Sequence, residues 1–405
     1  MIGKLFRKER MWRTHPLRSS YDVVIVGAGV HGLATAYYLG KEHGVRSVAL
    51  LEKSYLGAGN SGRNTAILRS NYRTPEGIPF YDASLKLYER MSEELGFNVM
   101  FSQGGHLTLA HSDSGITGLR VRAENNQLLG VDSRLIFPEE IRLMVPSMSL
   151  NPQARYPILA GLYHPPGGVI RHDAVVWAYS RACDRMGIEI HPFTEVTAIR
   201  RSGRNIESVA TNRGDIATST VVNCTAGWAT TVSDMVEVPL PIISYPLQAC
   251  VTEPLKPFLN QVIVSASLHV YVNQTDKGEL VIGAEIDPYQ SYSTKSTLPT
   301  LEQMASYTLE LFPQLHTVRV LRQWGGVCDM TPDFAPIIGQ AEEVDGFFMS
   351  VGWGTYGFKA GPAGGRFTAE LVATRRTPPI IAPFSPSRFR EGRQLGEKAA
   401  AAVSH

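Results

Sequence analysis

The strongest constraint on the fold lies near the N-terminus, where two apolar runs flank a glycine-rich segment. The run at 21–26 leads into GAGVHG at 27–32, a helical pattern covers 31–41, and the second run at 48–52 ends in Glu52. Strand, glycine turn, helix and strand within about thirty residues form a βαβ unit, which closes right-handed. The segment therefore predicts two parallel strands joined by a helix.

The spacing of the glycines predicts a dinucleotide-binding turn. Gly27 permits the tight turn, Gly29 lets the backbone approach a pyrophosphate at the helix N-terminus, and Gly32 allows close helix packing. Glu52 is placed to accept hydrogen bonds from ribose hydroxyls. FAD and NAD proteins share this fingerprint, so other segments must decide between the two cofactors.

Length and composition predict a globular protein with two domains, or with one dinucleotide-type domain that carries a large insertion. A chain of 405 residues exceeds what one hydrophobic core usually organises, and 43% hydrophobic with 19% charged residues excludes disorder. Lys plus Arg at 39 against Asp plus Glu at 37 leave a net charge of +2, too balanced for a nucleic-acid-binding protein. No run is long and apolar enough to span a bilayer, so we expect a soluble protein.

The cysteines and the basic N-terminus bear on cellular location. The four cysteines contain no CxxC pair, which excludes a disulfide framework and zinc-ribbon spacing and favours a cytoplasmic protein with no metal site. Basic residues within 1–20 precede an apolar run, as in a secretion signal, but glycines break that run and it holds the ligand motif. We expect 1–20 to form a surface arm, with contact to a partner subunit as the alternative.

Two later segments favour FAD. Residues 59–69 form a polar, glycine-containing loop soon after Glu52, rich in donors for phosphates and flavin carbonyls. Residues 220–228 are typical of a strand that ends at Gly227, the usual shape of a second approach of backbone to the dinucleotide. A plain strand-to-turn junction is the alternative for this second segment.

The C-terminal part carries a family resemblance. TPDFAPIIG at 331–339 and GWGTYGFK at 352–359, taken with the N-terminal fingerprint, resemble the FAD-dependent amine oxidoreductases of the D-amino-acid oxidase and sarcosine oxidase superfamily. The resemblance runs from Tyr21 to Ala373, with the motifs in the family's order. GGVIRHD at 167–173 is most similar to the β subunits of the bacterial heterotetrameric sarcosine oxidases.

The coarse element pattern predicts a discontinuous ligand domain. Helices are expected at 80–95 and 169–187, and strands at 193–200, 206–211, 215–222, 262–272 and 280–286. We expect an α/β fold with a β-rich insertion, in which a GxGxxG FAD domain is interrupted by an antiparallel-sheet substrate domain. The expected FAD-binding pieces are 20–93, 155–228 and 321–385, the substrate pieces are 94–154 and 229–320, and the terminal extensions are 1–19 and 386–405.

The resemblance implies which residues hold the flavins. His172 would be linked covalently to a second flavin, FMN, and a neutral imidazole can serve as the nucleophile. Arg171 and His269 would line the FMN site, although a core histidine on a strand is the alternative for His269. The residues expected to bind FAD are Gly27, Gly29, Val30, His31, Gly32, Glu52, Lys53, Asn60, Ser61, Arg63, Asn64, Thr65, Val196, Gly227, Gly354, Gly357, Phe358 and Lys359.

Arg69 and Lys359 match family positions that clamp the substrate carboxylate. An amino acid needs its carboxylate fixed so that its C–H bond faces the flavin, and two cations, one of them bidentate, provide that anchor. A cation near the flavin also stabilises the anionic reduced ring. If Arg69 is not the substrate cation, Arg63 and Arg73 are the next candidates.

The sequence departs from the monomeric relatives at two places. Where those proteins tether FAD through a cysteine, this chain has Gly326, with Cys328 two residues away, so we expect noncovalent FAD and keep a thioether at Cys328 as the alternative. The lysine that activates oxygen in monomeric relatives has no clear counterpart near 280–283. Oxygen would then react elsewhere, for example at the FMN.

The resemblance implies oxidative demethylation of sarcosine with production of hydrogen peroxide, glycine and a one-carbon unit. It also implies α, γ and δ partner subunits, with NAD and tetrahydrofolate bound by a partner. A related dehydrogenase or oxidase of dimethylglycine, proline or a D-amino acid is the second interpretation. A non-catalytic flavin-binding scaffold subunit is the third.

Overall fold

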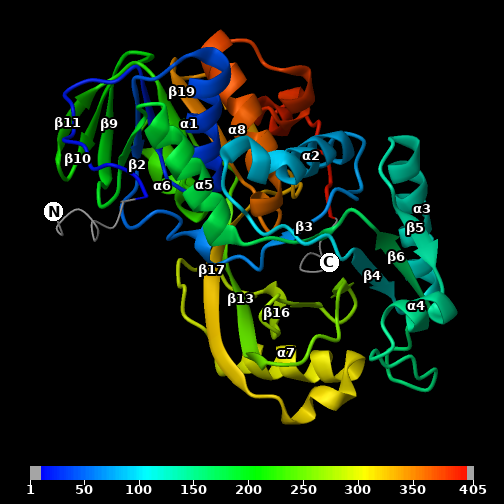
Figure 1. Ribbon diagram of the computed structural model, residues 1–405. Coiled ribbons are helices and arrows are strands. Elements are labelled where there is room, and N and C mark those ends of the chain that lie inside the picture. The colour runs from blue at the N-terminus through cyan, green and yellow to red at the C-terminus, as the bar shows by residue number, and fades with distance from the viewer. Residues whose placement is uncertain (1–10, 399–405) are drawn as a thin grey trace, which may run out of the picture.

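The structure is a computed structural model that describes residues 11–398, apart from the side chain of Glu285 (Figure 1). Its strands form two large sheets and two small ones. In Figure 1 the six-stranded sheet and its helices occupy the upper part, and much of the eight-stranded sheet lies below them, with α7 at the foot. No helix within the described residues has both the length and the apolar character needed to cross a bilayer.

The six-stranded sheet contains the N-terminal βαβ unit. Its order is β18-β19-β12-β1-β2-β8, and every pair is parallel except β18 with β19. The two central strands of the unit, VVIV and VALL, are apolar and buried throughout, as expected for strands covered on both faces. The strands are Val23–Val26 (β1), Val48–Leu51 (β2), Glu189–His191 (β8), Val221–Asn223 (β12), Ile337–Gln340 (β18) and Phe347–Val351 (β19).

Four helices share one hydrophobic core with one face of this sheet. They are α1 (Val30–His43), α2 (Gly77–Leu95), α5 (His172–Arg185) and α8 (Gly357–Thr374). Helix α8 approaches α1 closely, because a Cβ placed on Gly365 would lie only 2.3 Å from the Cβ of Ala34. The glycines of α8 therefore allow the two helices that border the dinucleotide turn to pack backbone against backbone.

A second core covers the opposite face of the sheet. It is built from a three-stranded antiparallel sheet, β11-β10-β9, and the short helix α6 (Ala229–Asp234). The three strands are Val196–Ser202 (β9), Asn205–Thr211 (β10) and Gly214–Ala217 (β11).

The eight-stranded sheet has the order β17-β13-β16-β15-β14-β4-β6-β5 and is antiparallel except for the β14–β4 pair. Its helices are α3 (Asp113–Leu128), α4 (Pro138–Met144) and α7 (Leu298–Leu311). Its strands are His106–Ala110 (β4), Arg134–Ile136 (β5), Ala160–His164 (β6), Ile243–Pro254 (β13), Val262–Ser265 (β14), Val270–Gln274 (β15), Glu279–Ile286 (β16) and Val320–Met330 (β17). A two-stranded sheet of β3 (Ile67–Leu68) and β7 (Gly168–Val169) completes the set.

Most expected elements are present, and two expected strands are each divided. The segment predicted as one strand at 215–222 forms β11 and β12, because the chain leaves the three-stranded sheet after Ala217 and enters the six-stranded one at Val221. The segment predicted at 262–272 forms the hairpin strands β14 and β15, and His269 takes a positive φ of 49° in the turn between them. The helix expected at 169–187 begins only at His172, because Val169 belongs to β7.

The sheets also bear on the proposed domain division. We assigned 155–228 and 321–385 to the FAD-binding domain, yet β6 and β17 from these ranges lie in the eight-stranded sheet. These two strands pair along much of their length with β4 and β13, so hydrogen bonding draws them into the other sheet. The division at 155 and 321 stays a proposal, and these strands argue for moving both limits.

The expected C-terminal surface extension is largely exposed over residues 390–394 but is anchored to the rest of the protein within residues 386–398. Arg388 is only 1% exposed and forms a buried ion pair with Asp333, and Glu397 is also buried. Charged residues are buried when paired and hydrogen-bonded, and sequence alone gave no sign of these partners. Residues 399–405, and residues 1–10 of the expected N-terminal arm, lie outside the described part of the chain.

Candidate active site

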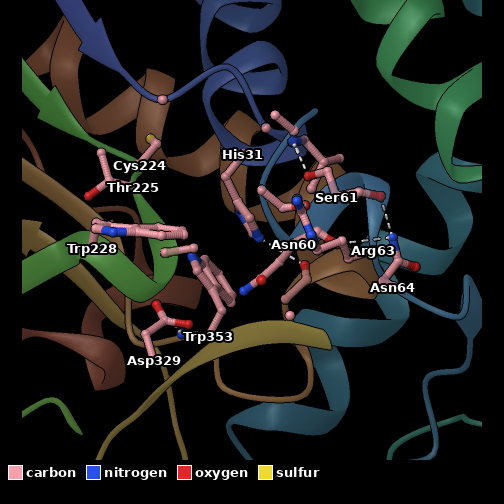
Figure 2. A pocket seen from close by; sticks show the side chains of 18 of the residues that line it. His31, Asn60, Ser61, Arg63, Asn64, Cys224, Thr225, Trp228, Asp329 and Trp353 are labelled. Atoms are coloured by element: carbon pink, nitrogen blue, oxygen red, sulfur yellow. Dashed lines mark hydrogen bonds between the residues drawn. The ribbon is translucent and has the colours of Figure 1, made fainter. Parts of the chain in front are cut away.

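A cavity of about 500 Å³ lies beside the dinucleotide turn, between the six-stranded and eight-stranded sheets. Its size falls within the range of roughly 300–1,000 Å³ typical of small-molecule sites. It is lined by the ends of β1 and β2, the loop at 58–67, the segment after β12, parts of β13 and β17, and the start of α8. Figure 2 shows Asn60, Ser61, Arg63 and Asn64 gathered on one side of this cavity and Trp228 on the other.

The structure brings most of the expected cofactor residues to this cavity. Those that line it are Gly27, Gly29, Val30, His31, Glu52, Lys53, Asn60, Ser61, Arg63, Asn64, Thr65, Val196, Gly354, Gly357, Phe358 and Lys359. Those outside the lining are Gly32, Gly227, Arg69, Arg171, His172 and His269.

The glycine turn has the geometry that its spacing predicts. Gly27 has a φ of 101°, and a Cβ on it would lie 2.6 Å from the carbonyl oxygen of Cys224. A Cβ on Gly32 would lie 2.0 Å from the carbonyl oxygen of Gly27. Helix α1 therefore starts directly behind the turn, and its N-terminus faces the cavity where a pyrophosphate would be stabilised.

Glu52 lies at the end of β2 with its carboxylate held in place. Oε2 accepts from the backbone N–H of Ala28 at 3.1 Å and Oε1 accepts from that of Ser54 at 2.9 Å. These bonds fix the carboxylate at the cavity wall, where its remaining lone pairs can accept from ribose hydroxyls. Next to it, the ammonium of Lys53 lies 4.1 Å from the centre of the Trp228 ring.

The loop at 59–65 uses much of its polarity to hold itself against β17. The Asn60 side chain donates to the carbonyl of Val327 at 2.6 Å and accepts from its N–H at 2.9 Å. The Trp324 indole donates to the carbonyl of Arg63 at 2.6 Å. Asn64 likewise donates to the carbonyl of Ser61 at 2.5 Å. The amides expected to donate to the cofactor thus fix the wall of the cavity, as the dashed bonds in Figure 2 illustrate for Asn64.

The C-terminal glycine segment closes the cavity with stacked rings. His31 stacks on Trp353 at 4.0 Å between ring centres, and its Nε2 bonds to the carbonyl of Gly357 at 2.8 Å. Burial lowers the pKa of His31 to about 3, so the ring is neutral at pH 7 and Nε2 is the donor. Asp329 accepts from the N–H groups of Gly352 at 2.6 Å and Trp353 at 3.1 Å. Burial nevertheless raises the pKa of Asp329 to about 6.

Asp329 and Trp228 are cavity residues that sequence reasoning did not select. Trp228 stacks at 6.1 Å on Tyr292, which comes from the segment after β16, so the pair joins the two halves of the cavity. The Trp at the end of 220–228 was a usable signal, because an aromatic ring directly after a ligand-binding strand suits a planar cofactor. Asp329 carried no such signal, since its role depends on a turn 23 residues further along the chain.

Lys359 and Arg69 are electrostatically coupled although only Lys359 lines the cavity. Burial, with a further contribution from the Arg69 charge, lowers the pKa of Lys359 to about 7. Within the described residues Lys359 forms no ion pair or side-chain hydrogen bond that would hold its ammonium. Arg69 is 4% exposed, donates to the carbonyl of Asn71 at 3.0 Å and lies over the Tyr72 ring at 4.5 Å.

The two alternative substrate cations differ in position. Arg63 lines the cavity and donates to the carbonyl of Gly59 at 3.3 Å. Arg73 is exposed and donates to the carbonyl of Lys398 at 3.0 Å, so its guanidinium is directed to the C-terminal segment. Arg63 is therefore the better alternative to Arg69.

His172 is the first residue of α5 and lies outside the cavity lining. Its Nε2 bonds to the carbonyl of Gly62 at 3.1 Å, so the loop that lines the cavity also contacts this histidine. Burial lowers the pKa of His172, which favours the neutral ring that a nucleophile requires. Arg171 pairs with Asp173 at 3.3 Å, and His269 occupies the β14–β15 turn.

Two further candidate cofactor residues remain, namely Gly227 and the alternative thioether site Cys328. A Cβ on Gly227 would lie 2.5 Å from a methyl group of Val327, so this glycine lets β17 approach the turn. Cys328 lines the cavity as a free thiol, and burial raises its pKa. Within residues 11–398, no group of three or more His, Cys, Asp and Glu side chains is placed to hold a metal ion.

A dinucleotide turn at the carboxyl ends of parallel strands, facing a second sheet across a cavity that holds a buried amine, is the architecture of a dinucleotide-binding protein. Glu52, the α1 N-terminus and the stacked segment at 353–359 fit the ribose, pyrophosphate and ring ends of such a cofactor. The comparisons with known proteins decide which family this is.

The chain matches the family described as FAD dependent oxidoreductase over residues 22–371. It is 43% identical over 397 residues to sarcosine oxidase subunit beta of Rhodobacter capsulatus, covering 98% of this chain and 95% of that one. It is 44% identical over 387 residues to the protein of the same name in Rhizobium meliloti, covering 96% and 92%. Among solved structures, L-proline dehydrogenase from P. horikoshii aligns with a TM-score of 0.86 at 29% identity, covering 93% of this chain and 99% of that one.

The chain therefore belongs to the FAD-dependent oxidoreductases and, within them, to the family of sarcosine oxidase β subunits. This confirms the resemblance drawn from the glycine fingerprint and the C-terminal motifs. FAD is accordingly the cofactor of this family, and the cavity beside the dinucleotide turn is its candidate site.

Proposed function

We propose that this chain is the catalytic β subunit of a sarcosine oxidase. It would remove a hydride equivalent from the N-methyl carbon of sarcosine. The observation that carries the proposal is Lys359, a cavity amine coupled to the Arg69 guanidinium and without a partner among the described residues. Two neighbouring cations suit one carboxylate, which would fix a small amino acid with its C–H bonds in the cavity.

FAD, when bound, supplies the electron acceptor for this oxidation. Glu52 would hold the ribose, the N-terminus of α1 the pyrophosphate, and the segment at 354–359 the ring end. The loop at 59–65 and the Trp228–Tyr292 pair would restrict water in the cavity. The protein's own residues would thus bind FAD, orient the substrate and stabilise the charges of both.

His172 is proposed as the covalent attachment site of FMN, with Arg171 and His269 beside it, and FAD is proposed to be noncovalent. The 3.1 Å contact between His172 and Gly62 supports this, because one loop would then serve both flavin sites. Electrons would leave through that second flavin to oxygen. The relatives are named as subunits, which supports a multi-subunit enzyme. We propose α, γ and δ partner subunits, with NAD and tetrahydrofolate bound by a partner. A cytoplasmic location stays a prediction.

The experiment that tests the reaction is anaerobic reduction of the purified FAD-containing enzyme by four substrates: sarcosine, dimethylglycine, proline and D-alanine. Fastest reduction by sarcosine, with glycine as product, supports the proposal. Preference for proline would favour the second interpretation, which the similarity to L-proline dehydrogenase at 29% identity also motivates. Loss of flavin reduction in Arg69→Ala or Lys359→Ala, with FAD retained, would count against the scaffold interpretation.

A further inference from the structure

The segment that carries Arg69 is irregular yet buried, so its backbone needs partners from elsewhere. Residues 69–74 lie in neither a helix nor a strand, and all except Arg73 are buried. A buried backbone N–H or C=O without a partner costs about 1–3 kcal/mol, so such a segment keeps one conformation only if other groups satisfy it. Which groups do so determines where the Arg69 guanidinium lies.

Helix α3 satisfies the carbonyl groups of this segment. Arg122 donates from Nε to the carbonyl of Asn71 at 2.7 Å, and Asn126 donates to that of Tyr72 at 2.9 Å. The carbonyl of Asn71 also accepts from Arg69 itself. Two buried guanidinium groups thus share one acceptor, and burial together with the Arg69 charge lowers the pKa of Arg122 to about 9.

The N–H groups at the end of the segment are satisfied by the C-terminal strap, which we define as residues 385–398. Glu397 accepts from the N–H of Arg73 at 3.1 Å and, through Oε2, from the N–H and hydroxyl of Thr74 at 3.0 and 2.6 Å. Glu397 is only 3% exposed, and the charge of its carboxylate also acts on Arg122. It therefore supplies both hydrogen-bond acceptors and a negative charge behind the two arginines.

The strap holds Glu397 rigidly in this position. Arg388 forms a two-point ion pair with Asp333 at 2.8 and 2.9 Å, and the same carboxylate accepts from the N–H of Leu395 at 3.1 Å. The backbone of Glu397 then donates to the carbonyl of Asp333 at 2.9 Å and accepts from the Tyr356 hydroxyl at 3.0 Å. The strap is thereby fixed to the motif at 331–339 and to the turn before α8, which carries Lys359.

The space around the Glu397 carboxylate is closed on its remaining side. A Cβ added to Gly77, the first residue of α2, would lie 2.5 Å from Oε2 of Glu397 and 2.8 Å from the Thr74 hydroxyl. Even a methyl group at this position would displace the carboxylate from its three donors. The site thus tolerates little movement of Glu397.

We propose that Glu397 is a positioning residue for substrate binding: through the strap it sets the conformation of residues 69–74 and hence the place of the Arg69 guanidinium. The inference rests on the proposed function, in which Arg69 binds the substrate carboxylate. On this proposal, the hydrogen bonds of the Glu397 carboxylate help to determine the affinity for a small amino acid, although Glu397 does not line the cavity.

The test compares Glu397→Gln with Glu391→Gln in the assembled, FAD-containing enzyme. Glu391 lies on the same strap, has a side chain 44% exposed and pairs with its neighbour Arg393, so it controls for the chemical change. Acetate binding is followed by the flavin absorbance change, and sarcosine kinetics give KM and kcat separately. We expect Glu397→Gln to raise the acetate Kd and the sarcosine KM about tenfold, as for loss of one hydrogen bond to a charged group. FAD content, kcat and the control should change little.

Three outcomes decide the inference. If Glu397→Gln lowers the melting temperature but binds acetate with wild-type affinity, Glu397 is only structural and the inference is overturned. If that variant does not assemble, Gly77→Ala provides the same displacement with all charges retained, and an unchanged acetate Kd there overturns it equally. Arg69→Ala separates the two proposals: a raised Kd in Arg69→Ala with none in Glu397→Gln refutes the strap alone, whereas no change in Arg69→Ala refutes the clamp itself.

Discussion

Carboxylate binding should depend on pH through Lys359. Burial and the Arg69 charge lower the pKa of Lys359 from 10.5 to about 7 in the free site, and a bound carboxylate favours the protonated amine. The protonated fraction of a group with a pKa of 7 falls about 25-fold between pH 6.5 and 8.5. Since only the protonated form attracts the anion, the Kd of a simple carboxylate should rise by about that factor over this range.

Acetate is the right probe, because its carboxylate stays ionised throughout this range while the amine of sarcosine itself would add a second titration. The Kd is measured from the flavin absorbance change in the FAD-containing enzyme at several pH values. Lys359→Gln should bind acetate roughly 30- to 900-fold more weakly at pH 6.5, which corresponds to about 2–4 kcal/mol for a charge-assisted contact in a desolvated site. Its Kd should then be flat with pH.

Lys359→Arg provides the decisive comparison. A guanidinium keeps its charge across this range, so the variant should lose the pH dependence without losing all affinity. Lys53→Gln, which removes another cavity-lining lysine, serves as the matched control and should keep the wild-type pH profile. A wild-type Kd that does not change between pH 6.5 and 8.5, or a dependence that survives in Lys359→Gln, would refute the reasoning.

Three further predictions concern the two proposed flavin sites and His164, the buried last residue of β6. His172→Ala should abolish the flavin that stays on the acid-denatured chain while FAD is still released, and a persistent covalent flavin would show that the attachment site is elsewhere. Glu52→Ala should weaken FAD binding by about 1–3 kcal/mol with near-normal turnover per bound FAD, measured by flavin content and titration, and full occupancy would contradict the ribose role. Burial lowers the pKa of His164 from 6.5 to about 4, so the unfolded chain binds more protons between these values and the free energy of unfolding should rise with pH there, by up to about 3 kcal/mol. Denaturant titrations of His164→Gln at pH 4.5 and 7 should show a smaller rise, and an unchanged difference would exclude His164 as its source.

The parts of the fold that could be predicted from sequence depend on short-range patterns. The βαβ unit was predictable because the apolar runs, the glycines and Glu52 all fall within 32 residues and each has one structural reason. Strand limits were less certain where the chain changes sheet without a proline or a long polar run, as between Ala217 and Val221. Nothing in the local sequence distinguishes one long strand from two short ones assigned to different sheets.

The candidate site was predictable only in outline, because its side chains take partners far away in sequence. Asn60 was expected to face the cofactor, yet both of its polar atoms bond to Val327, 267 residues away. Glu397 and Arg388 look in the sequence like ordinary charges of a polar tail, and their burial depends on Asp333 and Thr74. The type of a polar residue determines which hydrogen bonds its side chain can form, but only the fold determines which residues are its partners.

One segment, residues 59–74, connects every part of the proposed chemistry. Its first half lines the cavity through Ser61 and bonds to His172 through the carbonyl of Gly62, and its second half carries Arg69 and receives the strap through Thr74. In between, Ile67 and Leu68 pair with Val169 and Gly168, directly before the histidine segment. A displacement of this one segment would therefore move the wall of the FAD cavity, the contact to His172 and the substrate cation together. The long-range side-chain bonds to this segment would therefore keep the two proposed flavin sites and the proposed substrate site at fixed distances from each other.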